Sequence, residues 1–286
     1  AVRMSYADPE TAKKVAEEAV AAGVITTNAD NAFLTVAENR SAMVFNDWSD
    51  HRVGADIISY MNGYADPRRE KMFTKGVWNN KEDFYGIRIG IDVANKDLFV
   101  TTYSSPVLNE SSPFLWMNAA EVAFLRAEGA LRGWNMGAEA KELYNSAIAL
   151  SFEQYGVSDK AADYIANTEL KPAAYTDPRS AFNDTGGPRS QITIAWEDEG
   201  GLERNLERII TQKWIAIFPL CVEAWSEFRR TGYPKLIPVV ENKSGGTIDS
   251  NTMPRRLWYP PVEYSENSAN ISSAVTNLLG GPDNGG

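Results

Sequence analysis

The chain has 286 residues, of which 43% are hydrophobic and 23% are charged, an ordinary globular composition. Its formal net charge of -10 argues against a nucleic-acid partner, because phosphate backbones require clustered Lys and Arg. No apolar run reaches the length of about 18 residues that a membrane-spanning helix needs. A single cysteine, Cys221, excludes an intrachain disulfide. No phosphate-binding loop or dinucleotide fingerprint appears, so we expect no cofactor.

The first predicted element is a helix that follows Asp8. Asp8 and Pro9 form a good N-cap and first-turn pair, and Gly23 is a typical stop signal. The apolar face of this helix needs a partner helix, and no earlier segment of the sequence provides one. We therefore expect the chain to be a fragment or an excised domain.

The next part of the chain predicts loops and a small β-element. Residues 26–69 are rich in Asn, Asp and Ser, with one predicted short helix from His51 to Met61 that ends at Gly63. Residues 84–93 alternate Ile with polar residues and predict one strand. Because a strand needs a partner, we expect short extended pieces such as residues 98–103 to pair with it.

Two helical patterns follow, over residues 118–131 and 138–155. Their lengths, the small residues Ala127 and Ala130 and the position of Tyr144 are typical of a tetratricopeptide-type helix pair. A short helix is predicted for residues 159–167. The loop that comes next contains Pro and Gly and leads into the last helical region.

The densest apolar and aromatic content lies in residues 209–234, which predict two helices that meet at Pro219. Gly232 and Pro234 close the second helix. Cys221 lies in this apolar run, so we expect it to be buried and inert. The side chains predicted to face inward are Leu206, Ile209, Ile210, Lys213, Trp214 and Ile217 in the first helix and Val222, Trp225 and Phe228 in the second.

This region also carries a family resemblance. The run Q-K-W-I-A at residues 212–216, E-A-W at 223–225 and R-R-T-G-Y-P at 229–234 resemble blocks of the SusD/RagB family of nutrient-binding outer-membrane lipoproteins. The run R-R-L-W-Y-P-P-V-E-Y-S-E-N-S-A-N at 255–270 is similar to the C-terminal block of that family. The D-P-R tripeptide at 66–68 resembles one that follows the family's ligand-side loops.

The resemblance implies a mostly α-helical fold with tetratricopeptide-like helix pairs, long irregular loops and a small β-element. Residues 1–286 would then be a SusD-like C-terminal domain, as a single domain or fragment, without the N-terminal helical-repeat half. The implied function is non-catalytic capture of an oligosaccharide or polysaccharide, or of a peptide, at the surface of the outer membrane. The implied partner is a SusC-like TonB-dependent transporter. The implied lipid anchor lies on an N-terminal segment that is not present here.

Three alternatives compete with this interpretation. A tetratricopeptide-type scaffold that binds a partner protein is the first. A glycoside hydrolase is the second, since Glu223 and Glu227 form a carboxylate pair; however, at i, i+4 they point the same way, and Arg230 is an ion-pair partner for Glu227. A metal site at Asp47, Asp50 and the sole histidine is the third, but the spacing lacks a calcium-loop pattern, which favours a solvated loop.

The tryptophans point to a ligand site. Trp116, Trp134, Trp214 and Trp225 have apolar neighbours at helices and predict core packing or helix capping. Trp48 and Trp78 lie among polar residues in predicted loops, where an indole is either a loop anchor or a platform for a sugar ring. We predict a site in the loop 41–52, and its residues are Trp48 as the stacking platform, Phe45 beside it and Asn46 and Asp47 as hydroxyl partners. A second candidate pair is Trp78 and Tyr85.

Overall fold

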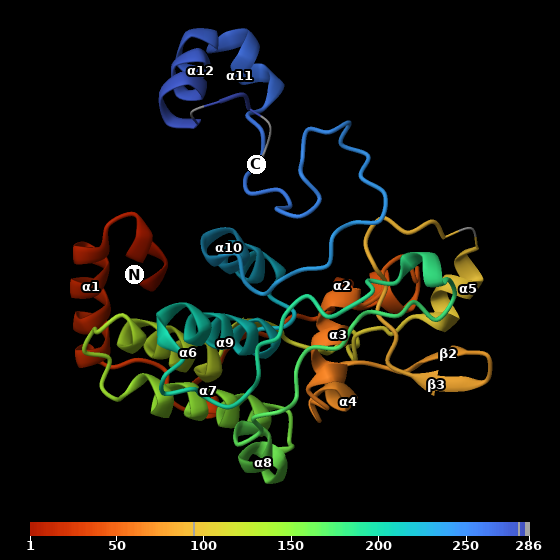
Figure 1. The fold of residues 1–286 in the computed structure, drawn as a ribbon, viewed down its shortest axis with the longest axis horizontal. Helices are drawn as coiled ribbons and strands as arrows, with labels where there is room; N and C mark the ends of the chain where they lie inside the picture. The colour runs from red at the N-terminus through yellow and green to blue at the C-terminus, as the bar shows by residue number, and fades with distance from the viewer. Residues whose placement is uncertain (94, 280, 284–286) are drawn as a thin grey trace. The chain divides into compact units, whose positions relative to one another are not determined.

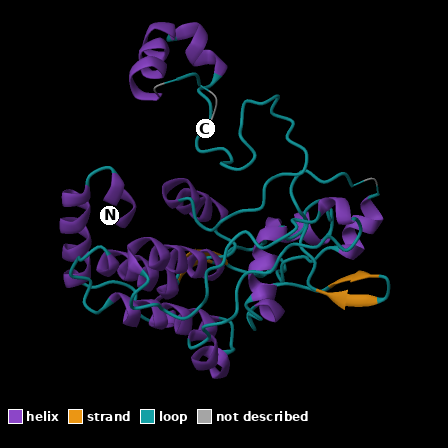
Figure 2. Cartoon of the chain, in the orientation of Figure 1, coloured by secondary structure: helices purple, strands orange, loops and turns teal. Residues whose placement is uncertain are grey.

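The computed structural model describes residues 1–93, 95–279 and 281–283. The chain is mostly helical, with two small two-stranded sheets and long loops between them (Figures 1 and 2). It divides into unit 1, which is Ala1–Arg88 with Asp92–Ile237, and unit 2, which is Ile89–Ile91 with Pro238–Gly286. Among the described residues, no helix has both the length and the apolar character that crossing a bilayer requires.

Unit 1 contains both sheets and the first ten helices, whereas α11 and α12 belong to unit 2. The helices are α1 (Pro9–Ala22), α2 (Arg40–Asn46), α3 (Ala55–Gly63), α4 (Arg69–Met72), α5 (Lys96–Thr102), α6 (Ala119–Leu131), α7 (Ala140–Gln154), α8 (Ala161–Ile165), α9 (Gly201–Ala216), α10 (Cys221–Thr231), α11 (Pro261–Glu266) and α12 (Ser268–Ala274). The strands are β1 (Ala32–Leu34), β2 (Gly76–Trp78), β3 (Lys81–Asp83) and β4 (Phe114–Met117).

Helix α1 has the ends predicted from the sequence. The Asp8 carboxylate accepts a hydrogen bond from the Thr11 N–H at 3.1 Å, which satisfies one of the free donors of the first turn. Gly23 ends the helix with a φ of 109°, a value that favours glycine. Ala12 and Ala16 are buried, so one face of α1 packs against the rest of unit 1.

Helices α6 and α7 form the predicted tetratricopeptide-like pair, and α9 packs against both. The Asn118 side chain joins the ends of the three helices. Its carbonyl oxygen accepts from the Glu121 N–H at 2.8 Å and so caps α6. Its amide donates to the Gln154 side chain at 2.9 Å, at the end of α7, and to the Ala216 carbonyl at 3.0 Å, at the end of α9.

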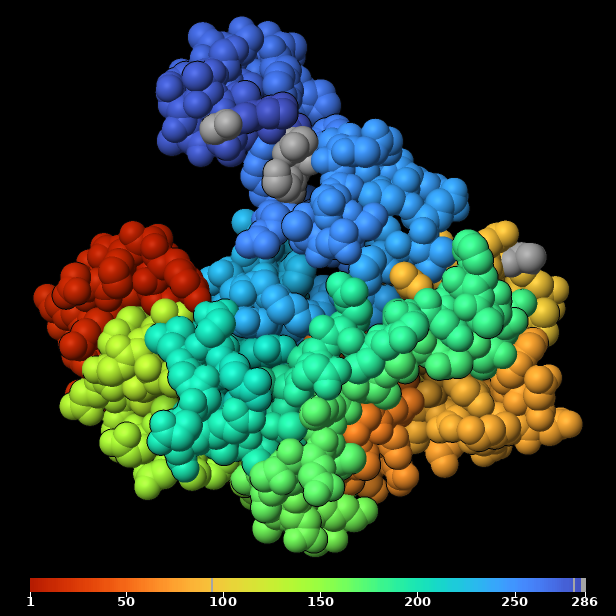
Figure 3. All heavy atoms as spheres, in the orientation of Figure 1, coloured from red at the N-terminus to blue at the C-terminus, as the bar shows by residue number. Residues whose placement is uncertain are grey.

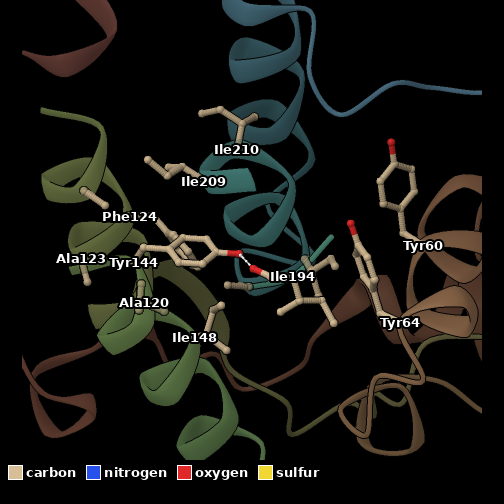
Figure 4. Packing of buried hydrophobic residues seen from close by; sticks show 14 of the residues in the cluster. Tyr60, Tyr64, Ala120, Ala123, Phe124, Tyr144, Ile148, Ile194, Ile209 and Ile210 are labelled. Atoms are coloured by element: carbon tan, nitrogen blue, oxygen red, sulfur yellow. Dashed lines mark hydrogen bonds between the residues drawn. The ribbon is translucent and has the colours of Figure 1, made fainter. Parts of the chain in front are cut away.

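The core of unit 1 lies between this helical layer and α3 (Figure 4). Phe124 of α6 meets Tyr144 of α7 edge to face at 6.1 Å, and the Tyr144 hydroxyl donates to the Ile194 carbonyl at 2.7 Å. The predicted apolar stripe of α9 is confirmed, since Leu206, Ile209 and Ile210 are fully buried.

The break at Pro219 is confirmed, but the burial predicted for the start of α10 is wrong. Phe228 is buried, whereas Val222 is 66% exposed. Val222 shares its helix face with Arg229, which points to solvent, so this face is the outer one. Cys221, the first residue of α10, is also exposed, so the buried position predicted for it is wrong.

The strand predicted for residues 84–93 does not form. Only Ile87 makes a β-bridge, a parallel one with Gly54. Gly86 lies against the Ala55 backbone, where an added Cβ would come within 2.6 Å of the Ala55 Cα. The alternation therefore reflects a loop that passes close to α3, and not a strand that pairs in a sheet.

The extended partner predicted at residues 98–103 is also wrong, because most of this segment is helix α5. The Asn95 carbonyl oxygen accepts from the backbone N–H groups of Asp97 at 2.8 Å and Leu98 at 3.2 Å, which starts the helix. The sheets come from other residues. Strands β2 and β3 form a hairpin through Asn79 and Asn80, both with positive φ, and β1 pairs antiparallel with β4.

The D-P-R tripeptide at 66–68 forms a buried ion pair in unit 1. Asp66 and Arg68 are fully buried, and the guanidinium donates to the carboxylate at 2.5 Å. Arg68 also donates to the Ser151 hydroxyl at 2.8 Å and to the Gln212 side chain at 3.2 Å. Its planar group lies over the Phe152 ring at 4.8 Å. This arginine therefore has its whole hydrogen-bonding fork engaged inside the core.

Asp283 contacts three residues of unit 2. Its carboxylate accepts from the Tyr259 N–H at 2.9 Å, from the Tyr264 hydroxyl and from the Arg256 guanidinium. Asn267, between α11 and α12, donates to the Glu263 carboxylate at 2.9 Å. Several residues of the C-terminal block at 255–270 therefore bond to Asp283 or to one another in unit 2.

Candidate functional site

An open pocket of about 430 Å³ lies beside the end of α2 in unit 1. One wall is the last turn of α2, and the other is the turn of residues 109–111. Most of its lining groups are polar, so it offers several hydrogen-bond donors and acceptors to a ligand. It is lined by Ala42, Met43, Asn46, Asp47, Asn109, Glu110 and Ser111.

Two asparagines fix the two walls to each other. Asn39 caps α2, donates from its backbone N–H to the Glu110 carbonyl at 2.7 Å and donates from its side chain to the Ser112 carbonyl at 2.7 Å. Asn46, at the other end of α2, donates to the Leu108 carbonyl at 3.0 Å. Because both ends of the helix hold the 108–112 segment, the pocket is formed without a ligand.

The predicted segment 41–52 has one part in this pocket and one part beside it. Asn46 and Asp47 line the pocket, and Trp48 follows with 54% of its surface exposed. Phe45 does not line it; this half-buried ring packs edge to face on His51 at 6.0 Å. Residues 40–46 are helical, so the prediction of a continuous loop is wrong, since Asn39 supplies a helix cap.

Sequence reasoning missed Asn109, Glu110 and Ser111. They form a tight polar turn in which the Asn109 side chain accepts from the Ser111 N–H at 2.9 Å. The polar run of residues 109–112 was the only local signal, and nothing in it indicates that α2 lies opposite.

The charged groups near this pocket are partly paired with one another. Asp50 forms an ion pair with Lys96 at 2.5 Å. Arg52 donates to the carbonyls of Val100 at 3.2 Å and Phe45 at 3.3 Å, and burial lowers its pKa. In the described part of the chain, no cluster of three or more His, Cys, Asp or Glu side chains is arranged to hold a metal.

The second candidate pair, Trp78 and Tyr85, does not share one pocket. Trp78 ends β2 and is half-buried, with the guanidinium of Arg179 over its ring at 5.8 Å from the centroid. Tyr85 lines a separate cavity of about 130 Å³ with Asn62 and Tyr175, and Trp78 does not line it.

The other tryptophans follow the prediction with one exception. Trp134 is buried, and Trp214 packs edge-on against Tyr60 at 5.5 Å. Trp225 is half-buried, with the Arg229 guanidinium at 4.5 Å from its ring centroid. The core position predicted for Trp116 is wrong, because it is 68% exposed at the edge strand β4.

Glu223 and Glu227 are ion-pair residues in this structure. Glu227 is 2% exposed and accepts from Lys213 at 2.8 Å, from Arg3 at 2.8 Å and, as predicted, from Arg230 at 3.1 Å. Burial alone would raise its pKa, but Lys213 and Arg230 outweigh burial and hold the pKa at about 2. Glu223 forms an ion pair with Arg3. Glu227 therefore stays ionised and has no proton to donate at neutral pH.

The fold and the motif positions together define the class. A mostly helical body around a tetratricopeptide-like pair, with Asp66, Arg68, Gln212, Lys213 and Arg230 bonded inside it, is a SusD-like architecture. Residues 1–286 match the family described as SusD-like, the SusD and RagB outer membrane lipoproteins. The chain belongs to this family.

Solved structures of several species share the fold. A SusD homologue from Bacteroides thetaiotaomicron is 53% identical, with a TM-score of 0.92, and the match covers 99% of this chain and 61% of that one. A chitin-binding SusD homologue from Flavobacterium johnsoniae is 43% identical, with a TM-score of 0.89, over 100% of this chain and 59% of that one. A SusD homologue from Bacteroides uniformis is 43% identical, with a TM-score of 0.90, and the match covers 99% of this chain and 60% of that one.

The chain thus spans about three fifths of the length of these solved relatives. No curated protein sequence matches the chain.

Proposed function

We propose that this protein captures an oligosaccharide or polysaccharide at the cell surface without cleaving it. The observation that carries the proposal is the polar pocket at α2 with the exposed Trp48 next to its lining residue Asp47. Membership of the SusD-like family supports it, as does the 43% identity to a homologue described as chitin-binding.

The groups at the pocket fit the two kinds of surface of a sugar. An exposed indole such as Trp48 packs against the C–H face of a pyranose ring. The hydroxyl groups of the sugar need hydrogen-bond donors and acceptors, which Asp47, Asn109 and Ser111 provide. Phe45 packs edge to face on His51 in the same segment, and Asn46 donates to the Leu108 carbonyl next to the facing turn. Trp78 and Tyr85 remain the second candidate for ligand contact.

The chemistry of the carboxylates supports a non-catalytic role. Hydrolysis of a glycoside needs a carboxylic acid that can give a proton to the leaving oxygen and a second carboxylate across the bond. Glu227 is buried and held ionised by Lys213 and Arg230, and Glu223 lies beside it on the same helix. This pair therefore serves as a structural ion-pair cluster.

The proposal includes a place in the cell. Residues 1–286 would form the C-terminal part of a longer lipoprotein, anchored by an N-terminal segment and facing outward from the outer membrane. The support is the family itself and the share of each solved relative that the chain covers. The proposed partner is a SusC-like TonB-dependent transporter that receives the captured glycan.

Isothermal titration calorimetry with Trp48→Ala tests the proposed site. The first ligand is a chito-oligosaccharide, and a panel of plant and mucosal glycans follows. Loss of one stacking aromatic costs on the order of 1–3 kcal/mol, so the affinity should fall at least several-fold. The matched control is Trp116→Ala, which removes an exposed indole outside the pocket and should leave binding unchanged.

Two results would contradict this assignment. Normal affinity in the Trp48→Ala variant would move the site elsewhere, first to Trp78 and Tyr85. Release of reducing sugar that Glu223→Gln abolishes would show that the protein is a hydrolase.

A further inference from the structure

A second Asp-Pro-Arg tripeptide, at residues 177–179, forms a turn on unit 1. The Asp177 carboxylate accepts from the Arg179 N–H at 2.8 Å and closes the turn. The same carboxylate accepts from the Tyr103 hydroxyl at 3.0 Å and from the Asn183 side chain at 2.7 Å. Asp177 is 4% exposed, so this set of bonds holds the turn rigidly. Its oxygens are occupied and form no ion pair with the arginine of the same turn.

No group in the described chain accepts a hydrogen bond from the Arg179 guanidinium. Its Nε–H is buried and has no acceptor, and its guanidinium forms no ion pair within the described residues. Its guanidinium carbon lies over the Trp78 ring, 5.8 Å from the ring centroid. The indole holds the planar group in place, as a stacked aromatic ring does for guanidinium groups that bind ligands.

An exposed aromatic ring belongs to the same turn. Phe182 lies in the short 3₁₀ turn Ala181–Asn183 and is 83% exposed, the largest exposure of any aromatic side chain described. Asn183 ties this turn to Asp177, so the backbone that carries Phe182 is fixed next to the backbone that carries Arg179. Figure 3 shows this green-to-teal segment crossing the face of unit 1 beside the orange and yellow segments.

The chemistry of this surface differs from that of the pocket at α2. Asp47 and Glu110 give that pocket two carboxylates, which disfavour an anionic group there. The two terminal NH2 groups of a guanidinium can together donate to the two oxygens of a carboxylate or sulfate. Exposed aromatic rings provide apolar contact for the sugar ring that carries such a group.

We propose that Arg179, which lies over the Trp78 ring and three positions before the exposed Phe182, is a subsite for an acidic sugar, one that carries a carboxylate or a sulfate ester. This inference rests on the proposed glycan capture and names the ligand class that it selects. Arg179 binds the anionic substituent, Trp78 orients the guanidinium, and Phe182 contacts the ring.

Calorimetry with matched oligosaccharides tests the subsite. Three ligands of equal length are compared: a neutral one, one with a terminal uronate and one with a sulfate ester. The wild-type protein should prefer at least one acidic ligand over the neutral one by about tenfold. Arg179→Gln should abolish this preference while leaving the affinity for the neutral ligand unchanged, and Arg179→Lys should keep part of it.

The control for charge is Arg204→Gln, which removes an exposed arginine paired with Glu197 and should keep the acidic preference. The uronate and sulfate ligands separate the two sources of negative charge. Equal affinity for neutral and acidic ligands, or a preference that survives Arg179→Gln, overturns the subsite.

A second measurement separates failure of the subsite from failure of glycan capture. If no oligosaccharide binds, the capture proposal fails, and free glucuronate and sulfate are titrated while the Trp78 indole N–H signal is followed by NMR. That signal is assigned with Trp78→Phe. A shift that disappears in Arg179→Gln supports an anion site there, and the absence of a shift refutes it.

Discussion

The two Asp-Pro-Arg turns of this protein share a hydrogen bond from a backbone N–H to the aspartate side chain, but their arginine side chains have opposite roles. In each, the aspartate accepts from the backbone N–H two residues on, at 2.9 Å for Asp66 and 2.8 Å for Asp177. Asp66 then binds the Arg68 guanidinium inside the core. Asp177 instead binds Tyr103 and Asn183, and Arg179 extends onto Trp78.

The difference teaches that the tripeptide determines the turn, whereas the neighbours determine what the arginine does. Arg68 is enclosed by Ser151, Phe152 and Gln212 from helices α7 and α9, so its charge contributes to folding. Arg179 is only partly buried, and its guanidinium lies over the Trp78 ring without a hydrogen-bonded side chain among the described residues.

The largest expected effect comes from breaking the enclosed turn. Arg68→Ala leaves the Asp66 carboxylate buried without its cation, which should lower the free energy of unfolding by about 3–5 kcal/mol. Urea denaturation measures this change. If Arg68→Ala unfolds at nearly the wild-type midpoint, the ion pair is not a main support of the core.

Glu227 provides a test of a second buried cluster of the same kind. Its pKa in the folded protein is about 2, against an ordinary value of 4.5, so its stabilising effect is complete above about pH 4.5 and is lost as the pH falls towards 2. Glu227→Gln should therefore lower the free energy of unfolding by about 2–3 kcal/mol at pH 7.

The matching measurement is thermal unfolding at several pH values. The gap between wild type and Glu227→Gln should narrow steadily between pH 4.5 and pH 2.5. A gap that is the same at both ends of this range would mean that the carboxylate is not held ionised by Lys213 and Arg230.

The smallest effects are expected in the open turn and separate its two residues. Asp177→Ala removes the acceptor for Tyr103 and Asn183 and should cost about 1–3 kcal/mol of stability. Arg179→Ala should change stability by less than about 0.5 kcal/mol, because it removes no ion pair. Guanidinium chloride denaturation compares the two variants, and a larger loss for Arg179→Ala would contradict the assignment.

The sequence predicted the longest helices of the fold well, because their signals are local. The cap at Asp8, the pattern of α6 and α7 and the apolar stripe of α9 all repeat at helical spacing or lie at helix ends. Two failures were missed local caps, at Asn39 for α2 and at Asn95 for α5, and others came from contacts with other segments. The alternation of residues 84–93 resembles a strand, but the segment is a loop that passes against α3.

In the candidate site, too, the sequence revealed only residues whose pattern is local. Asn46, Asp47 and Trp48 were found because polar residues flank an aromatic one, a pattern visible within a few positions. The facing turn of residues 109–111 was not found, because its position depends on hydrogen bonds from Asn39 and Asn46, more than sixty positions away in the chain. The exposure of Cys221 and Val222 likewise depends on where the core ends along α10.

The side chain of Asn118 also affects local unfolding in unit 1. It bonds to the start of α6, to the Gln154 side chain at the end of α7 and to the Ala216 carbonyl at the end of α9, so fraying of any one of these ends leaves a polar atom of this buried amide unsatisfied. Local openings of the three ends are therefore coupled. In native-state hydrogen exchange, the amide protons there should exchange as one cooperative unit, and Asn118→Ala should divide that unit into independent segments.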